Sequence, residues 1–167
     1  NKDDPFDGLD NDQDGYIDNY RGWDFGGKSG NGFGDKDPSY RSKHGVSVTG
    51  IAAATPDNMI GSAGVGFNCR YLPVKASPDN APNAITHGYE SVLYAAEQGA
   101  QVINCSWGGR VNSQFAKDII DYVVEIKKSA VVAACGNAPA DLRFYPAAFK
   151  NVLSVTNLHF QDTVCCP

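Results

Sequence analysis

Residues 131–137 read Val-Val-Ala-Ala-Cys-Gly-Asn and decide the fold class. The apolar run predicts a buried β-strand, and the glycine after it predicts a tight turn that presents the side chain of Asn137. Shorter apolar runs at 102–106 and 152–155 predict further strands, and helical spacing of apolar residues at 84–98 and after Ser113 predicts helices. This alternation predicts an α/β fold with a parallel sheet flanked by helices.

Polar and small residues follow two of these predicted strands. Ser106, Trp107 and Gly108 follow one strand, and the Cys-Gly-Asn turn follows the next. In parallel sheets, ligands bind beyond the carboxyl ends of the strands. We therefore expect the two segments to line one crevice.

Residues 44–54 predict a helix of small residues that begins with His44 and can pack close to a sheet. A histidine base and a fixed amide donor such as Asn137 are two of the groups that acyl-transfer chemistry needs. The segment 44–50 reads His-Gly-Val-Ser-Val-Thr-Gly.

Together, the histidine segment and the strand-Gly-Asn segment resemble those of the subtilisin-like serine proteases (subtilases). That family usually has His-Gly-Thr-His-Val-Ala-Gly and Ala-Ala-Gly-Asn at these places, and residues 145–147 match its Tyr-Pro-Ala. The resemblance implies an incomplete subtilisin-like three-layer α/β fold over residues 44–167. It also implies serine endopeptidase activity on peptide or protein substrates and a secreted or cell-surface location.

The resemblance also implies a role for each matching residue. His44 would be the general base, and Asn137 would donate a hydrogen bond to the oxyanion. One wall of the first specificity pocket would be formed by Ser106, Trp107 and Gly108, and the opposite wall by Ala134, Cys135 and Gly136. Ser106 itself is not in a nucleophile-elbow motif and is not expected to be the nucleophile.

Two motifs of the family are missing from the sequence. No Gly-Thr-Ser-Met-Ala nucleophile segment and no Asp-Thr-Gly strand end occur, and neither Asp18 nor Asp24 follows a predicted strand. We therefore expect the chain to be the middle of a protease domain, inactive alone. The alternatives are a non-catalytic, calcium-stabilised binding domain with a protease-like fold, and a flavodoxin-like domain, which lacks the expected Gly-rich phosphate loop.

Residues 1–43 are rich in Gly, Asp, Asn and Ser and predict a long irregular region. Eight aspartates against one lysine and one arginine give residues 1–24 a net charge of −6, while the whole chain has −5. This distribution argues against nucleic-acid binding and favours a cation site. No apolar run approaches the ~20 residues of a membrane span.

Within this region, alternating acidic residues predict a calcium loop. The candidate ligands are Asp10, Asp12, Asp14, the carbonyl of Tyr16, and Asp18. Arg21 stands where an EF-hand would have its closing glutamate, so Asp3, Asp4 or Asp7 would have to supply a further ligand. The alternative is a solvated acidic loop.

The chain has five cysteines and no Cys-x-x-Cys pair, which argues against a structural zinc site. Cys105 and Cys135 lie in apolar segments and are predicted to be small buried side chains. Cys165 and Cys166 are adjacent and poorly placed to bridge each other.

Overall fold

The structure is a computed structural model that describes residues 1–28, 34–39, 42–137 and 142–158. The tail at 160–167, with Cys165 and Cys166, lies outside the described residues. The chain divides into two compact units, residues 1–91 and 92–167. The division at residue 43, which rests on composition, stays a prediction. Within the described residues, no helix is both long enough and apolar enough to cross a membrane.

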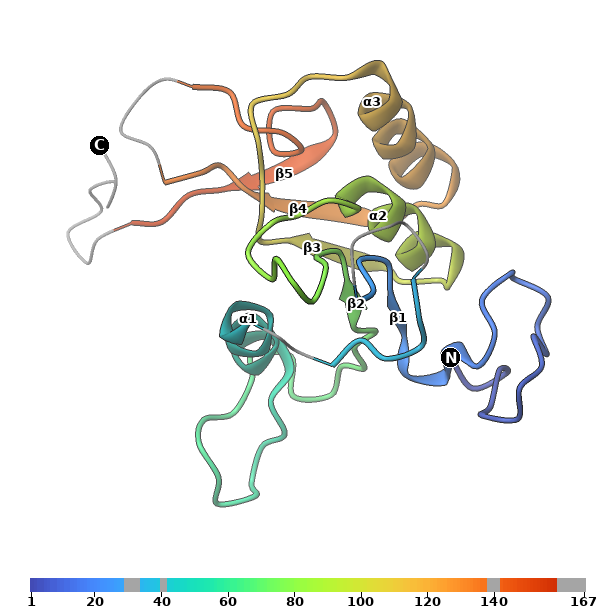
Figure 1. The fold of residues 1–167 in the computed structure, drawn as a ribbon. Coiled ribbons are helices and arrows are strands. Elements are labelled where there is room, and N and C mark those ends of the chain that lie inside the picture. The colour runs from blue at the N-terminus through green and yellow to red at the C-terminus, as the bar shows by residue number, and fades with distance from the viewer. Residues whose placement is uncertain (29–33, 40–41, 138–141, 159–167) are drawn as a thin grey trace. The chain divides into compact units, whose positions relative to one another are not determined.

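The second unit contains a parallel sheet of three strands, β3 (Val102–Cys105), β4 (Ala130–Ala134) and β5 (Val152–Val155). Figure 1 shows them side by side with β4 in the centre. Cys105 pairs with Ala133, and Ala134 pairs with Val155. Alternate residues of β4 are buried, as expected for a strand that packs one face on a core. The predicted parallel α/β arrangement is confirmed.

Two helical segments accompany this sheet, as the sequence predicts. Helix α2 (Gly88–Glu97) begins four residues later than the apolar spacing indicates. Helix α3 (Gln114–Asp121) follows its cap residue Ser113, whose hydroxyl accepts a hydrogen bond from the amide of Ala116 at 3.2 Å. It continues into a π-helical turn, η2 (Tyr122–Ile126).

The apolar face of α3 and η2 supplies much of the core of this unit. Ile119, Ile120 and Val123 are buried, as helical spacing predicts. Phe115 and Ile126 continue the same helical spacing of apolar residues but are exposed. Phe115 lies in the first turn of α3, and Ile126 is the last residue of the π turn, which departs from the 3.6-residue spacing of an α-helix.

The first unit contains a pair of short parallel strands, β1 (Trp23–Asp24) and β2 (Val74–Lys75). The short helix η1 (Asn19–Arg21) precedes β1. The prediction that residues 1–43 are irregular and that Asp24 belongs to no strand is therefore wrong at this point. Strand β2 is short, because Val74 and Lys75 are its only residues that pair with β1.

Helix α1 (Lys43–Ala53) confirms the predicted helix at the histidine motif, but it has no buried residue. That this helix packs close to a sheet stays a prediction. The helix is held at its carboxyl end, where the amides of residues 64, 65 and 66 donate to the carbonyls of Ala54, Ile51 and Ala52 at 2.8–2.9 Å. These bonds satisfy carbonyls that a helix end leaves unpaired.

Candidate functional site

The segments that follow β3 and β4 leave the sheet at the same edge. The register pairs Cys105 with Ala133 in parallel, so both strands present their carboxyl ends on one side. Ser106 lies directly after β3, and its hydroxyl accepts a hydrogen bond from the side-chain amide of Asn104 at 2.8 Å. The segments after β3 and β4 therefore emerge next to each other, as expected. That they line one crevice stays a prediction.

The turn after β4 requires a glycine. The φ angle of Gly136 is +101°, and a Cβ added there would lie 2.9–3.0 Å from the Phe144 ring. Cys135 extends the strand pairing by donating its amide to the Val155 carbonyl at 3.0 Å. Asn137, the next residue after the glycine, is exposed. The turn thus ends in an accessible amide side chain.

A second connection joins the loop after β3 to the Tyr-Pro-Ala segment. Gly109 and Tyr145 form an antiparallel bridge, with amide-to-carbonyl distances of 2.9 and 2.7 Å. A Cβ on Gly108 would lie 3.1 Å from the Tyr145 carbonyl and 3.8 Å from that of Ala134. These contacts bring residues of both predicted pocket walls, with the Tyr145 segment, into one small region.

His44 lies in the first turn of α1, after the cap residue Ser42, whose hydroxyl accepts from the His44 amide at 3.4 Å. The imidazole is exposed. His44 belongs to the first unit and Asn137 to the second. That the two face one crevice stays a prediction.

Two cysteines of the second unit differ in their surroundings. Cys105 is 1% exposed, and burial raises the pKa of its thiol to about 12. A thiol with this pKa stays protonated at neutral pH and is a poor nucleophile. The low exposure of Cys105 confirms the prediction that it is a small buried side chain. Cys135 is half-buried.

The acidic loop of the first unit brings together three carboxylates. Oxygens of Asp4, Asp10 and Asp12 lie within 4.8 Å of one another. Asp4 is fully buried and accepts backbone amides of Asn11 at 2.9 Å and Asn19 at 2.8 Å. These bonds explain why Asp4 joins the cluster although it lies outside the alternating motif.

The other predicted ligands have different partners. Asp14 accepts hydrogen bonds from the Tyr16 amide at 2.8 Å and from the Asn19 side chain at 2.7 Å. The carboxylate of Asp18 is 3% exposed and pairs with Lys36. The hydrogen bond from Lys36, followed by that from the Gly8 amide, holds the pKa of Asp18 below its usual value. Within the described residues, Asp14 and Asp18 thus lie outside the three-carboxylate group.

Tyr16 anchors the loop to β1. Its ring packs edge-on against Trp23 at 5.0 Å and Phe25 at 5.7 Å between centroids. Burial and the nearby charge of Asp14 raise the pKa of Tyr16. The aromatic contacts position the acidic segment; whether the Tyr16 carbonyl binds a cation stays a prediction.

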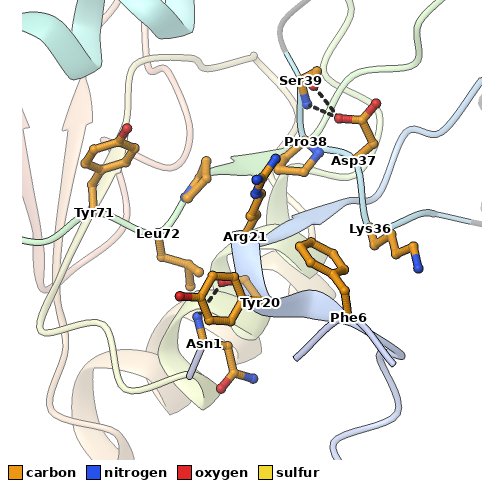
Figure 2. Close-up of a pocket in the computed structure, with 11 residues that line it drawn as sticks. Asn1, Phe6, Tyr20, Arg21, Lys36, Asp37, Pro38, Ser39, Tyr71 and Leu72 are labelled. Atoms are coloured by element: carbon orange, nitrogen blue, oxygen red, sulfur yellow. Dashed lines mark hydrogen bonds between the residues drawn. The ribbon is translucent and has the colours of Figure 1, made fainter. Parts of the chain in front are cut away.

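The first unit also has an open hollow of about 680 Å³ beside this loop (Figure 2). Phe6, Tyr20 and Arg21 lie near one another in it, and the Arg21 guanidinium lies 5.6 Å from the Phe6 ring centre. None of the predicted catalytic, pocket or metal residues lines this hollow.

The observed sheet and flanking helices define an incomplete three-layer α/β fold of the subtilisin type. A family model described as "Subtilase family" matches residues 3–165. The chain belongs to the subtilase family.

Two serine proteases illustrate the similarity. Thermophilic serine proteinase from Bacillus sp. (strain AK1) is 38% identical over 72% of this chain and 30% of its own length. Thermitase from Thermoactinomyces vulgaris is 34% identical over 84% of this chain and 48% of its own length. The chain therefore spans less than half of these curated relatives.

A solved structure agrees with this relation. The crystal structure of MycP1 with its N-terminal propeptide removed superposes with a TM-score of 0.63 at 25% identity. The match covers 84% of this chain and 51% of that chain.

The halolysin-like extracellular serine protease Nep of Natrialba magadii is a further relative by sequence. It is 31% identical over 90% of this chain and 27% of its own length.

Proposed function

We propose that the chain is part of the catalytic domain of a serine endopeptidase that hydrolyses peptide bonds in peptides or proteins. The observation that carries the proposal is the family match over residues 3–165 together with the shared sheet edge from which the predicted pocket walls emerge. The nucleophilic serine and the triad aspartate would lie outside these 167 residues.

In this proposal, each residue does a task suited to its chemistry. His44 takes the proton of the serine hydroxyl as it attacks the peptide carbonyl, and later gives it to the leaving amine. The exposed amide of Asn137 donates a hydrogen bond to the oxyanion. The walls formed by residues 106–108 and 134–136 hold the substrate side chain before the scissile bond.

We further propose that the acidic loop binds calcium. Three carboxylates within 4.8 Å repel one another unless a cation compensates them. Hard oxygen donors of this kind suit Ca²⁺, and backbone amides already fix the orientation of Asp4 and Asp10. The donor chemistry therefore fits the ion, with Asp4 joining Asp10 and Asp12.

A secreted location forms part of the same proposal. One relative is named an extracellular protease, and another, from Bacillus subtilis (strain 168), a cell wall-associated protease. An external calcium concentration in the millimolar range would suit a loop of weak or moderate affinity.

The direct test uses the longer protein that contains this chain and the flanking segments found in its relatives. We expect it to hydrolyse a fluorogenic casein, and His44→Ala to reduce hydrolysis to background. His87→Ala is the matched control, because the His87 ring hydrogen-bonds its neighbour Thr86 and lies in no predicted catalytic segment. A protein that binds peptides but cleaves none would instead support the non-catalytic binding domain.

A further inference from the structure

The open hollow of the first unit lies at the amino ends of strands β1 and β2. Tyr20 and Arg21 precede β1, and residues 71–73 directly precede β2. Because the two strands are parallel, both segments lie at the same edge of the pair. Residues 36–39 and Phe6 of the acidic loop also line the hollow. None of these residues has a role in the proposed function.

The backbone between the two strand ends is closely packed. Gly22, which links Arg21 to β1, has a φ angle of +101°, and a Cβ there would lie 2.0 Å from the carbonyl oxygen of Pro73. Only a glycine allows the two backbones to approach this closely. The amide of Gly22 also donates to the Asn19 carbonyl at 2.8 Å. The backbone that carries Arg21 is therefore fixed against the segment that precedes β2.

Three aromatic side chains line the hollow and stay accessible. Phe6 and Tyr20 are 49% and 48% exposed, with 6.0 Å between their ring centres and 56° between the ring planes. Tyr71 is 63% exposed, and Figure 2 shows it on the opposite side of Arg21 from Phe6. Exposed apolar side chains gathered in one place are typical of interaction surfaces, and aromatic-lined grooves bind extended peptides. The hollow therefore offers ring contacts on both sides of one cation.

The cation, Arg21, is placed to bind an anion. Its guanidinium lies over the Phe6 ring, 5.6 Å from the ring centre, and among the described residues no carboxylate pairs with it. Lys36, 5.4 Å from the same ring centre, is instead paired with the buried Asp18. A guanidinium held over a ring keeps N–H groups that can form a bidentate bond to a carboxylate.

The carboxylates around the hollow have partners of their own. Asp37 lines the hollow and accepts hydrogen bonds from the amide of Ser39, at 3.1 Å, and from its hydroxyl (Figure 2). Asp18 is paired with Lys36. The three-carboxylate group of the acidic loop accepts backbone amides through two of its members, Asp4 and Asp10. Arg21 is therefore the charge of the hollow that can still take a carboxylate.

We propose that this hollow binds an extended, acidic segment of another polypeptide. A glutamate or aspartate of the segment pairs with Arg21, and apolar side chains on either side of it pack on Tyr71 and on the rings of Phe6 and Tyr20. An extended chain uses the whole hollow of about 680 Å³, whereas a small anion would contact Arg21 and leave the rings exposed. This inference goes beyond the proposed endopeptidase function and does not depend on it.

The experiment measures, by fluorescence anisotropy, the binding of a labelled peptide Ser-Phe-Ser-Glu-Ser-Phe-Ser that is blocked at both ends. In an extended chain, its glutamate and both phenylalanines point to the same side. The longer protein carries His44→Ala, so that the proposed activity does not consume the peptide. We expect saturable binding, about tenfold tighter than that of the same peptide with glutamine for glutamate, because the charged pair is lost.

Variants of the hollow assign the binding to its residues. Arg21→Gln should weaken binding of the glutamate peptide about tenfold and leave the glutamine peptide nearly unchanged, so that the preference disappears. Tyr71→Ala should weaken both peptides, because it removes a ring and keeps the cation. Lys150→Gln, at an exposed lysine outside the hollow, is the matched control and should change neither. Melting curves confirm that each variant is folded.

Three results would overturn the assignment. They are a preference for glutamate that survives Arg21→Gln, no saturable binding of the glutamate peptide up to ~1 mM, and unchanged binding in Tyr71→Ala with displacement by inorganic phosphate. The last result would indicate a site for a simple anion. Because no cleavage is measured, failure of the endopeptidase function would leave these readouts unaffected.

Discussion

At the scale of single residues, Asn137 shows how local geometry prepares a chemical group. The strand ends, Gly136 adopts a left-handed φ that a side chain would strain, and the amide that follows is exposed. A donor held in this way needs little reorganisation when charge develops on a substrate oxygen. The role in the oxyanion hole is our proposal, and a quantitative prediction follows from it.

Asn137→Ala in the longer protein should lower kcat by about 10²–10³-fold, the loss known for the oxyanion-hole asparagine of subtilisin, a member of the same family. KM should stay nearly unchanged, because the hydrogen bond forms only in the transition state. Asn112→Ala, at an exposed asparagine in the loop before α3, should leave kcat unaltered. Equal kcat values for the Asn137 and Asn112 variants would remove the oxyanion role.

Residue-scale chemistry also shows what the sequence can and cannot predict. The histidine and Gly-Asn motifs are recognisable because their residue types and order carry the signal. Asp4 is only one of three possible additional ligands in the sequence, since its place depends on amides of Asn11 and Asn19 far along the loop. The contact of the Phe144 ring with Gly108 and Gly136 gives no signal in the sequence, because the three residues come from different loops.

At the scale of elements, the short strands β1 and β2 are stabilised by a buried ion cluster. Lys75 donates to Asp24 at 2.6 Å and to Asp79 at 2.8 Å, and the side chains of Lys75 and Asp24 are 8% and 2% exposed. Asp24 also accepts the amides of Gly26 and Gly27. Two-residue strands have no apolar periodicity, so the sequence could not reveal a pair that depends on charge and backbone contacts.

Lys75→Met should lower the free energy of unfolding by about 3–5 kcal/mol, because it leaves Asp24 buried without its cation. The matched control is Lys117→Met, which removes a pair with Asp121 on the exposed surface of α3 and should cost less than about 1 kcal/mol. Urea unfolding of the longer protein measures both. Similar losses for the two variants would show that the buried cluster adds no special stability.

The same cluster predicts a dependence of stability on alkaline pH. Burial disfavours the charged amine, but hydrogen bonds and charges of Asp24 and Asp79 outweigh it and raise the pKa of Lys75. A raised pKa in the folded state means that the contribution is complete below the unfolded value of about 10.4. It is then lost as pH rises through the higher folded pKa. The stability difference between unaltered protein and Lys75→Met should therefore shrink above about pH 10.4; a constant difference would contradict the linkage.

The proposed calcium site in the acidic loop predicts that calcium stabilises the folded protein. Calcium in hundredfold excess over Kd should stabilise the folded protein by about 2.7 kcal/mol, and magnesium should do so less because it demands a tighter octahedron. Asp12→Asn should remove most of the rise in Tm, whereas Asp3→Asn, at an exposed aspartate outside the three-carboxylate group, should retain it. Melting curves that are identical with calcium and with chelator would return the segment to a solvated acidic loop.

At the scale of the whole molecule, the fold is best predicted from sequence where long apolar runs pair with one another. Strands β3, β4 and β5 lie at the predicted places. Side chains of β3 and β4 enter the core, whereas β5 has no buried residue and is held by its pairing with β4. Helix α1 forms as predicted but buries none of its residues, since periodicity indicates a helix without specifying what covers it. The chain spans less than half of the curated serine proteases described above.

The most direct test of the central claim is to map where a fluorophosphonate serine probe reacts in the longer protein by mass spectrometry. We predict one labelled serine outside residues 1–167 and loss of labelling in His44→Ala, because in the proposed function His44 activates a nucleophile that lies elsewhere in the longer protein. A label on a serine within residues 1–167, Ser106 included, or labelling that persists without His44, would contradict this claim.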